Sequence, residues 1–506
     1  MTRPTPVTPI DAGPSGVVDH FATAQVAVDA HLARRLGDVC DSVSELDEDR
    51  ADAGRDWWPV AIGWAAAGEV PSRPALVARP TDTAQVSAVL SLCDEARVPV
   101  TPAGGRSGVC GASIPLFGGV ALDLCGLDGI VDVDDTSLVA DLRAGTFGPD
   151  VESGLRDGHG LTLGHWPQSM DLSTVGGWLA CRGAGQYSNR YGKIEDMVLG
   201  LEVVLADGRI VRTGGHGPRS ATGPDLTQLF VGSEGTLGVI TEGRFRVHPM
   251  PEGEGRRAFG FTSFADGLDA CRRILRRGAS PAVLRLYDAT ESGRNFDQPE
   301  TNVLIVLDEA DPALIDATLA VVDQECAAAA SLDAGLVDRW LAHRNDVSAL
   351  APLWRAGVVV DTVEVSGRWG ALPGLYRDVV DALGRVPGTL AASSHQSHAY
   401  TDGACLYFTF AGRPPEELQD DVTGRDAWVA DYYRRSWDEV TRATLDAGGA
   451  LSHHHGVGLN RGRFLHDALG GAFDVLVAVK GTLDPHGILN PGKLGLPTPY
   501  GEVPWP

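Results

Sequence analysis

Residues 102–108 are Pro-Ala-Gly-Gly-Arg-Ser-Gly, and the fold assignment begins from this loop. It follows the apolar run Val98–Thr101, which predicts a short strand. Two adjacent glycines let the backbone approach a ligand closely and point several N–H groups at it. The loop lacks GxGxxG spacing, and no Gly-Lys-Ser/Thr follows as in a P-loop. Because tight turns also use such glycines, the interpretation depends on the surrounding segments.

Three further glycine-containing segments lie downstream. They are residues 167–177 (PQSMDLSTVGG), residues 182–185 (RGAG) and residues 232–240 (GSEGTLGVI). They supply backbone donors and small side chains with few charges. A flavin dinucleotide needs such a lining, because its diphosphate and ring carbonyls accept hydrogen bonds where there is little room. Together the four segments predict a bound flavin.

Composition narrows the class of protein. The chain has 506 residues, 43% apolar residues and a formal net charge of −25. No run of about 18 apolar residues predicts a membrane-spanning helix, and residues 1–13 lack the apolar core of a secretory signal. The acidity argues against nucleic-acid binding. Eight cysteines, without CxxC or zinc-site spacing, indicate reduced thiols and a cytoplasmic location.

Helix and strand patterns predict an α+β chain in four parts. They are an N-terminal helical arm and connector (1–70), a cofactor domain (71–250), a cap or substrate domain (251–415) and a helical C-terminal segment (416–506). The Pro/Gly-rich residues 249–255 mark the central boundary. Apolar spacing predicts helices over residues 20–48 and over Thr81–Ala96, the latter capped by Asp82 or Thr83. The turn Ala206-Asp-Gly-Arg209 predicts a hairpin.

The order PxGGxS, PxSxxxSTVGGW, RGAG and GPDLTQLFVGSEGTLGVI resembles the FAD-binding domain of the vanillyl-alcohol oxidase/p-cresol methylhydroxylase (PCMH) superfamily. Other segments resemble the alkylglycerone-phosphate (alkyldihydroxyacetonephosphate) synthases and their bacterial relatives. The resemblance covers about residues 50–495 and is carried by Asp56–Pro59, Gly164–Pro167, Arg285–Asp288, Asp402–Tyr407 and Ser452–Gly458. It implies a two-subdomain PCMH-type FAD-binding domain, an α+β cap domain and a helical C-terminal segment whose His-His-His motif returns to the active site.

The resemblance also implies site residues. The implied catalytic residues are Tyr407, His453, His454, His455, His165 and Arg285. The implied FAD contacts are Pro102, Ala103, Gly104, Gly105, Arg106, Ser107, Gly108, Gln168, Ser169, Met170, Asp171, Leu172, Ser173, Thr174, Arg182, Gly183, Ala184, Gly185, Glu234, Gly235, Thr236, Leu237, Gly238, Val239 and Ile240.

In the synthases the flavin is noncovalent, and its N5 traps a carbanion while a fatty acyl group is exchanged for a fatty alcohol without net redox change. The expected partners are a small-molecule or lipid-like substrate and, as an option, a second copy in a homodimer. Some related oxidases link the flavin to a histidine in the first loop. Cys110 stands at that place here, and we predict noncovalent FAD.

The polar residues support this chemistry but leave alternatives. Tyr407 beside a histidine suits proton transfer, although the aromatic strand Ala404–Phe410 is also compatible with a plain core. Adjacent side chains of the histidine triplet 453–455 diverge, so one or two are expected in the site. Related hydroxy-acid dehydrogenases bind a metal through HxGDGNxH and EHG. Here tyrosines 400 and 407 and His454 replace ligands, so we predict no metal.

One position departs from the synthase pattern. Leu350 stands where the synthases have a substrate-contacting arginine, and the nearby Arg344 and Arg355 do not align with it. A phosphate dianion would miss that cation, because charge-assisted hydrogen bonds are the strong ones. Leu350 therefore favours an FAD-dependent oxidase or dehydrogenase of an alcohol or hydroxy acid. Tyr407 and the histidine triplet favour a synthase, and both hypotheses stay open.

Overall fold

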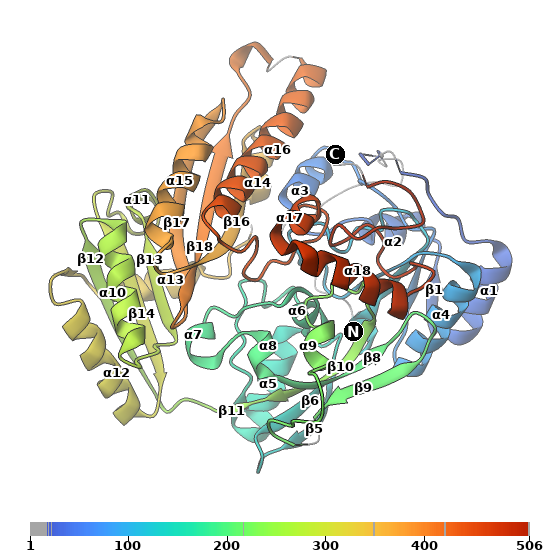
Figure 1. Ribbon diagram of the computed structural model, residues 1–506, viewed down its shortest axis with the longest axis horizontal. Helices are drawn as coiled ribbons and strands as arrows, with labels where there is room; N and C mark the ends of the chain where they lie inside the picture. The colour runs from blue at the N-terminus through green and yellow to red at the C-terminus, as the bar shows by residue number, and fades with distance from the viewer. Residues whose placement is uncertain are drawn as a thin grey trace.

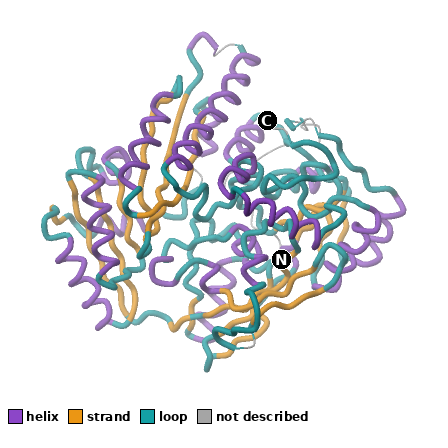
Figure 2. Tube along the Cα trace, in the orientation of Figure 1, coloured by secondary structure: helices purple, strands orange, loops and turns teal. Residues whose placement is uncertain are grey.

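The computed structural model describes residues 18, 20, 21, 23–215, 217–347, 350–418 and 421–503. Two lobes lie side by side (Figures 1 and 2): one holds a four-stranded, a five-stranded and a two-stranded sheet, and the other holds a single seven-stranded sheet. The predicted class, α+β with the PCMH-type architecture, is confirmed. No helix within the described ranges is long and apolar enough to cross a membrane.

The first sheet of the cofactor lobe is mostly parallel and has the order β1-β2-β4-β3. Its strands are β1 (Ser42–Ser44), β2 (Leu76–Arg79), β3 (Val100–Ala103) and β4 (Val120–Asp123). Its core packs against α1 (Ala30–Val39) and α4 (Thr83–Ala96). Asp82 caps α4 by accepting from the Gln85 N–H, as predicted.

The helix predicted over residues 20–48 is wrong in extent. Within that range α1 is the only complete helix; strand β1 follows it, and α2 (Asp47–Asp52) begins at the end of the range. Before α1 the chain runs extended, and the Val26 N–H donates to the Phe117 carbonyl. That backbone pairing outweighs the apolar spacing, which is a local signal.

The second sheet is antiparallel, with order β5-β6-β10-β8-β9. Its strands are β5 (Ile130–Asp134), β6 (Val139–Arg143), β8 (Val198–Val204), β9 (Ile210–Gly214) and β10 (Val239–Arg246). The β8–β9 pair is the predicted hairpin, with Gly208 at φ +85° in its turn. Around it lie α5 (Gly148–His159), α6 (Val175–Cys181), α7 (Ser188–Tyr191), α8 (Ile194–Met197), α9 (Thr227–Phe230) and the pair β7 (Leu161–Thr162) and β11 (His248–Pro249). Loops make up much of this lobe (Figure 2). The glycine segments lie in these loops and extend into the ends of β3, α6 and β10.

The cap lobe is built on a seven-stranded antiparallel sheet of order β15-β12-β14-β13-β17-β18-β16. Its strands are β12 (Gly253–Phe261), β13 (Val283–Tyr287), β14 (Asn302–Ala310), β15 (Ala330–Ser331), β16 (Val359–Arg368), β17 (Thr389–Ala399) and β18 (Gly403–Gly412). Side chains alternate across each strand, so the sheet has two faces. One packs on α10 (Phe264–Arg276), α12 (Pro312–Glu325), α15 (Leu372–Arg385) and α16 (Val422–Asp446).

The other face carries the shorter helices that reach toward the cofactor lobe. Val303 and Ile305 point to this side and pack with Trp340 and, from the cofactor lobe, Tyr187. The shorter helices on this face are α11 (Ala289–Phe296) and α13 (Gly335–His343). Helix α14 (Leu350–Arg355) packs against both α3 (Pro59–Ala66) and β16. After α16 the chain returns to the cofactor lobe through α17 (Leu465–Leu469) and α18 (Gly471–Leu483) (Figure 1). The limits of the four predicted parts remain predictions.

Candidate functional site

A cavity of about 800 Å³ lies where the cofactor lobe meets the cap lobe. All seven residues of 102–108 line it, with parts of the other three glycine segments. The cap contributes Arg285, Tyr407 and His395, and the chain after α16 contributes His454 and His455. The structure therefore brings the predicted cofactor and catalytic segments to one place.

The first two glycine segments touch so closely that only glycine fits. A Cβ at Gly105 would lie 1.8 Å from the Leu172 carbonyl oxygen, and one at Gly104 would lie 2.2 Å from Thr174 Oγ1. Arg106 has φ +54° and Glu234 has φ +50°, a left-handed conformation that non-glycine residues seldom adopt. Such strain accumulates at ligand-binding loops.

The polar atoms around the cavity test whether FAD fits. Thr174 Oγ1, Arg106 Nη2, Gln186 Oε1 and Asn490 Oδ1 are buried without a hydrogen-bond partner among the described residues, and all four residues line the cavity. Leaving such groups unsatisfied costs free energy, so a polar ligand there is favourable. These donors and acceptors, together with the glycine loops, fit a flavin dinucleotide.

Not every predicted FAD contact lines the cavity. Arg182 extends outward to Glu195, Met170 packs at Gly148, and the Thr236 hydroxyl donates to the Ser233 carbonyl. The predicted contacts outside the lining are Met170, Asp171, Arg182, Gly185, Thr236 and Leu237. Neighbouring side chains of one loop point into the core, into solvent or into the cavity. The sequence of a contiguous motif does not show which of its side chains reach the cavity.

Glu234 lines the cavity, but its carboxylate serves the backbone. Its oxygens accept from the Val457 N–H at 2.6 Å and the Gly458 N–H at 2.8 Å. Burial raises the pKa of this carboxyl to about 7. Glu234 thus ties the fourth glycine segment to the turn after the histidine triplet.

Tyr407 and His455 form a hydrogen-bonded pair in the cavity wall. Tyr407, on β18, lies with its Oη 3.0 Å from His455 Nε2, and its ring stacks on His395 at 5.0 Å. Burial lowers the pKa of His455 to about 4, so the imidazole is neutral at pH 7. His455 Nδ1 lies 3.9 Å from Glu364 Oε1, too far for a hydrogen bond. In the tautomer with its proton on Nδ1, the ring accepts the Tyr407 hydroxyl at Nε2. The pair is arranged for general base catalysis.

Glu364, on β16, fixes the position of the histidine triplet through hydrogen bonds to its backbone. Its carboxylate accepts from Ser452 Oγ at 2.6 Å, from the backbone N–H groups of residues 453–455, and from Arg461 Nη1 at 3.0 Å. Burial alone would raise its pKa, but Arg461 and the triplet outweigh it and hold the pKa at about 2. Sequence analysis missed this residue, because nearly 90 positions separate it from the loop that it binds.

The histidines divide into two groups. His454 and His455 line the cavity, whereas His453 does not; its Nε2 lies 3.0 Å from Tyr400 Oη, and its ring stacks on His398. His165 lines the cavity and packs on Trp178, and burial lowers its pKa to about 3. The geometry agrees with the expectation that the triplet does not act as a unit, and the catalytic roles remain predictions.

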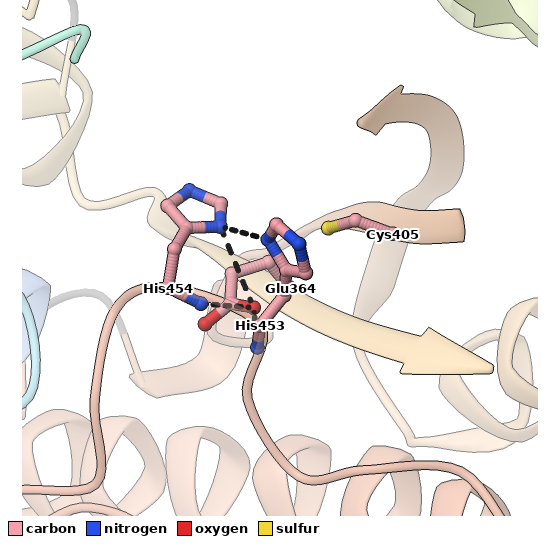
Figure 3. A group of neighbouring side chains, drawn as sticks. All are labelled: Glu364, Cys405, His453 and His454. Atoms are coloured by element: carbon pink, nitrogen blue, oxygen red, sulfur yellow. Dashed lines mark hydrogen bonds and ion pairs between the residues drawn. The ribbon is translucent and has the colours of Figure 1, made fainter. Parts of the chain in front are cut away.

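Four residues in this network have ligand atoms within 4.8 Å of one another: Glu364, Cys405, His453 and His454 (Figure 3). Both Glu364 oxygens already accept hydrogen bonds, and Arg461 neutralises the carboxylate. Burial raises the pKa of the Cys405 thiol well above its usual value, which disfavours the thiolate that binds metals. The arrangement fits a hydrogen-bonded support for the triplet, and the absence of a metal remains a prediction.

The two arginines near Leu350 differ in whether they reach the cavity. Leu350 and Arg344 both line the cavity, whereas Arg355 is exposed outside it. Arg285 lines it from β13. Its Nε donates to Tyr287 Oη and its Nη2 to His395 Nε2 at 2.8 Å.

Comparisons with known proteins agree with this site. Residues 74–214 match the FAD binding domain family, and residues 251–494 match the C-terminal domain of FAD linked oxidases. The chain is 30% identical to the uncharacterized FAD-linked oxidoreductase YgcU of Escherichia coli O157:H7, over 83% of this chain and 89% of the relative. It is 29% identical to alkyldihydroxyacetonephosphate synthase of Dictyostelium discoideum, over 85% of this chain and 74% of the relative.

Two solved structures share the fold. A crystal structure of alkyldihydroxyacetonephosphate synthase superposes with a TM-score of 0.75 at 24% identity, over 96% of this chain and 89% of the other. Substrate-bound p-cresol methylhydroxylase gives 0.72 at 17% identity, over 94% and 99%. The predictions of FAD, of a flavoenzyme and of the superfamily are confirmed. The chain belongs to the FAD-linked oxidoreductase family, within the PCMH-type superfamily that includes the alkyldihydroxyacetonephosphate synthases.

Proposed function

We propose that this protein is an FAD-dependent enzyme of alkyldihydroxyacetonephosphate-synthase type that removes a proton from a carbon next to a substrate carbonyl. The observation that carries the proposal is the 3.0 Å contact between Tyr407 Oη and His455 Nε2 in the wall of the cavity that holds the glycine loops. The Tyr407 oxygen receives the substrate proton as its own proton passes to His455 Nε2. Glu364 keeps His455 in place through its backbone N–H.

The four glycine segments would hold FAD, which supplies an electron-accepting ring when bound. Noncovalent binding is supported by Cys110: burial raises the pKa of its thiol far above the usual value, so little nucleophilic thiolate forms. The unpaired cysteines suit a reducing compartment, and we place the protein in the cytoplasm.

The second candidate is an oxidase or dehydrogenase of an alcohol or hydroxy acid on the same scaffold. Leu350 favours it, because this side chain lines the cavity without supplying the cation that the synthase pattern has there. The YgcU relative, by its name an FAD-linked oxidoreductase, is compatible with it.

The deciding experiment incubates the FAD-loaded protein anaerobically with an acylated glycerone phosphate and a fatty alcohol, and detects the alkyl product by mass spectrometry. A synthase forms the product without lasting loss of flavin absorbance. Lasting bleaching by an alcohol or hydroxy acid, with no alkyl product, would establish the second candidate.

Tyr407→Phe tests the assigned base. It should lower turnover by at least ~100-fold, the usual size of a lost general base, while the bound FAD stays constant. Tyr500→Phe, outside the cavity lining, is the control. Turnover within about threefold of the parent in Tyr407→Phe would contradict the assignment of the base.

A further inference from the structure

Two arginines that line the cavity form no ion pair with a carboxylate of the described residues, and Arg285 is the first. Its guanidinium contacts the Tyr287 hydroxyl, the His395 ring and the face of Trp340, which lies 5.5 Å from Cζ. His395 Nδ1 contacts Glu291 at 2.7 Å from the opposite side of the ring. Burial lowers the pKa of His395, so a neutral ring lies between this cation and the carboxylate.

Arg344, directly after α13, is the second. Its Cζ lies 5.0 Å from the Tyr187 ring, 5.6 Å from Trp340 and 5.8 Å from Trp166. Aromatic faces hold a guanidinium by cation–π attraction without neutralising it. Its Nη1 is buried and has no hydrogen-bond partner within the described part of the chain.

Other arginines of this protein show the contrast. In the same cavity lining, Arg294 pairs with Glu291 and Arg339 with Asp297. The buried Arg461 pairs with Glu364 at 3.0 Å. In a chain with a net charge of −25, carboxylates are plentiful. Among the described residues, Arg285 and Arg344 nevertheless form no ion pair with a carboxylate, which sets them apart from these other arginines.

Both guanidinium groups pack on the same indole, that of Trp340. Each guanidinium carries its full charge in a wall of low dielectric constant, and a bound anion lowers the cost of holding that charge there. Guanidinium nitrogens bind oxyanions through short, charge-assisted hydrogen bonds. Leu350 lines the same cavity and adds no charge.

We propose that Arg344, with Arg285, binds an oxyanion of the substrate at the cap end of the cavity, a phosphate monoester or a carboxylate. Arg344 thereby supplies the cation that Leu350 does not. The inference rests on the proposed function in taking this cavity as the substrate site, and it holds for either candidate reaction.

The test measures anion binding directly, by calorimetric titration of the FAD-loaded protein. The probes are glycerol 3-phosphate, lactate and, as the neutral control, glycerol. The parent protein should bind one of the two anions more tightly than glycerol, and the anion it prefers identifies the group recognised. Arg344→Gln and Arg285→Gln should each weaken that binding by at least ~10-fold, the loss expected for a hydrogen bond to a charged group. Arg355→Gln, which replaces an exposed arginine outside the cavity lining, should not change anion binding.

A charge-restoring variant guards against loss through misfolding. Arg344→Gln with Leu350→Arg should recover part of the lost affinity, with melting temperature and bound FAD as folding controls. Unchanged anion binding in Arg344→Gln, or no preference of the parent for either anion over glycerol, would overturn the proposal. Failure of the proposed base is seen separately, since Tyr407→Phe should leave anion binding intact whatever it does to turnover.

Discussion

At Gly105 a single added carbon atom would prevent the close contact between the first two glycine segments. A Cβ there would lie 1.8 Å from the Leu172 carbonyl oxygen, and backbone cannot yield as a flexible side chain can. We expect Gly105→Ala to lower FAD affinity by at least ~10-fold, because one loop must shift away from the other. Gly158→Ala, outside the cavity lining, is the control, since nothing lies within 4 Å of its added Cβ. The readout is bound flavin per polypeptide after gel filtration, and a fully loaded Gly105→Ala would refute the expectation.

His455 predicts a pH dependence. Burial lowers its pKa to about 4, so it stays a competent base across neutral pH and is protonated only in acid. Turnover limited by this group should fall on acidification with a midpoint near pH 4, as its pKa requires. The folded pKa lies below the unfolded one, so its contribution to stability is complete above the unfolded pKa and declines as pH falls toward the folded value. Turnover measured across this range, with circular dichroism as the folding control, checks the midpoint. A midpoint near the ordinary histidine pKa of about 6.5 would show that the His455 imidazole is solvated.

At the scale of elements, strand β16 supports the catalytic loop through Glu364. Glu364→Gln should lower the free energy of unfolding by roughly 3–5 kcal/mol, because Arg461 is left buried without its counter-charge. Glu95→Gln, which removes an exposed pair with Arg35, should cost no more than about 1 kcal/mol. Denaturant unfolding measures both, and equal costs would contradict the assigned role. The depressed pKa of Glu364 adds stability that is present above its unfolded pKa and is lost as pH falls through about 2.

Elements with local signals were predictable. Helix α4 carries its own cap in Asp82, and the β8–β9 hairpin carries its turn in residues 206–209. Strand β17 was missed, because TLAASSHQSHA has no apolar alternation. Some of its buried polar side chains find partners on other elements: Ser393 donates to Glu291, and Gln396 donates to the Leu284 carbonyl. That compensation exists only in the assembled sheet.

At the scale of the whole molecule, Arg190 of α7 in the cofactor lobe binds Asp308 of β14 in the cap lobe through both carboxylate oxygens. Asp308 is completely buried. Asp308→Asn should therefore lower the Tm of the FAD-loaded protein by about 5 °C or more, since an unpaired guanidinium remains at the junction.

The control for this junction is Asp323→Asn, which removes an exposed pair with Arg257 within the cap lobe. Scanning calorimetry should show a change below about 2 °C there. Equal shifts in the two variants would mean that the junction does not depend on this ion pair.

The cofactor, the superfamily and the flavoenzyme class could be inferred from contiguous segments such as residues 102–108 and 232–240. Turn chemistry and close backbone approach act over a few neighbouring residues, so each loop carries its own signal. The residues that line the cavity, and those that support its lining, have no such local signal. His395 and Arg344 line the cavity and Glu364 supports the histidine triplet; they come from separate parts of the cap lobe, and no local pattern marks them. Which histidine faces the cavity, and which arginine lacks a counter-charge, depends on packing between residues far apart in the chain, because burial and charge pairing are properties of the folded molecule.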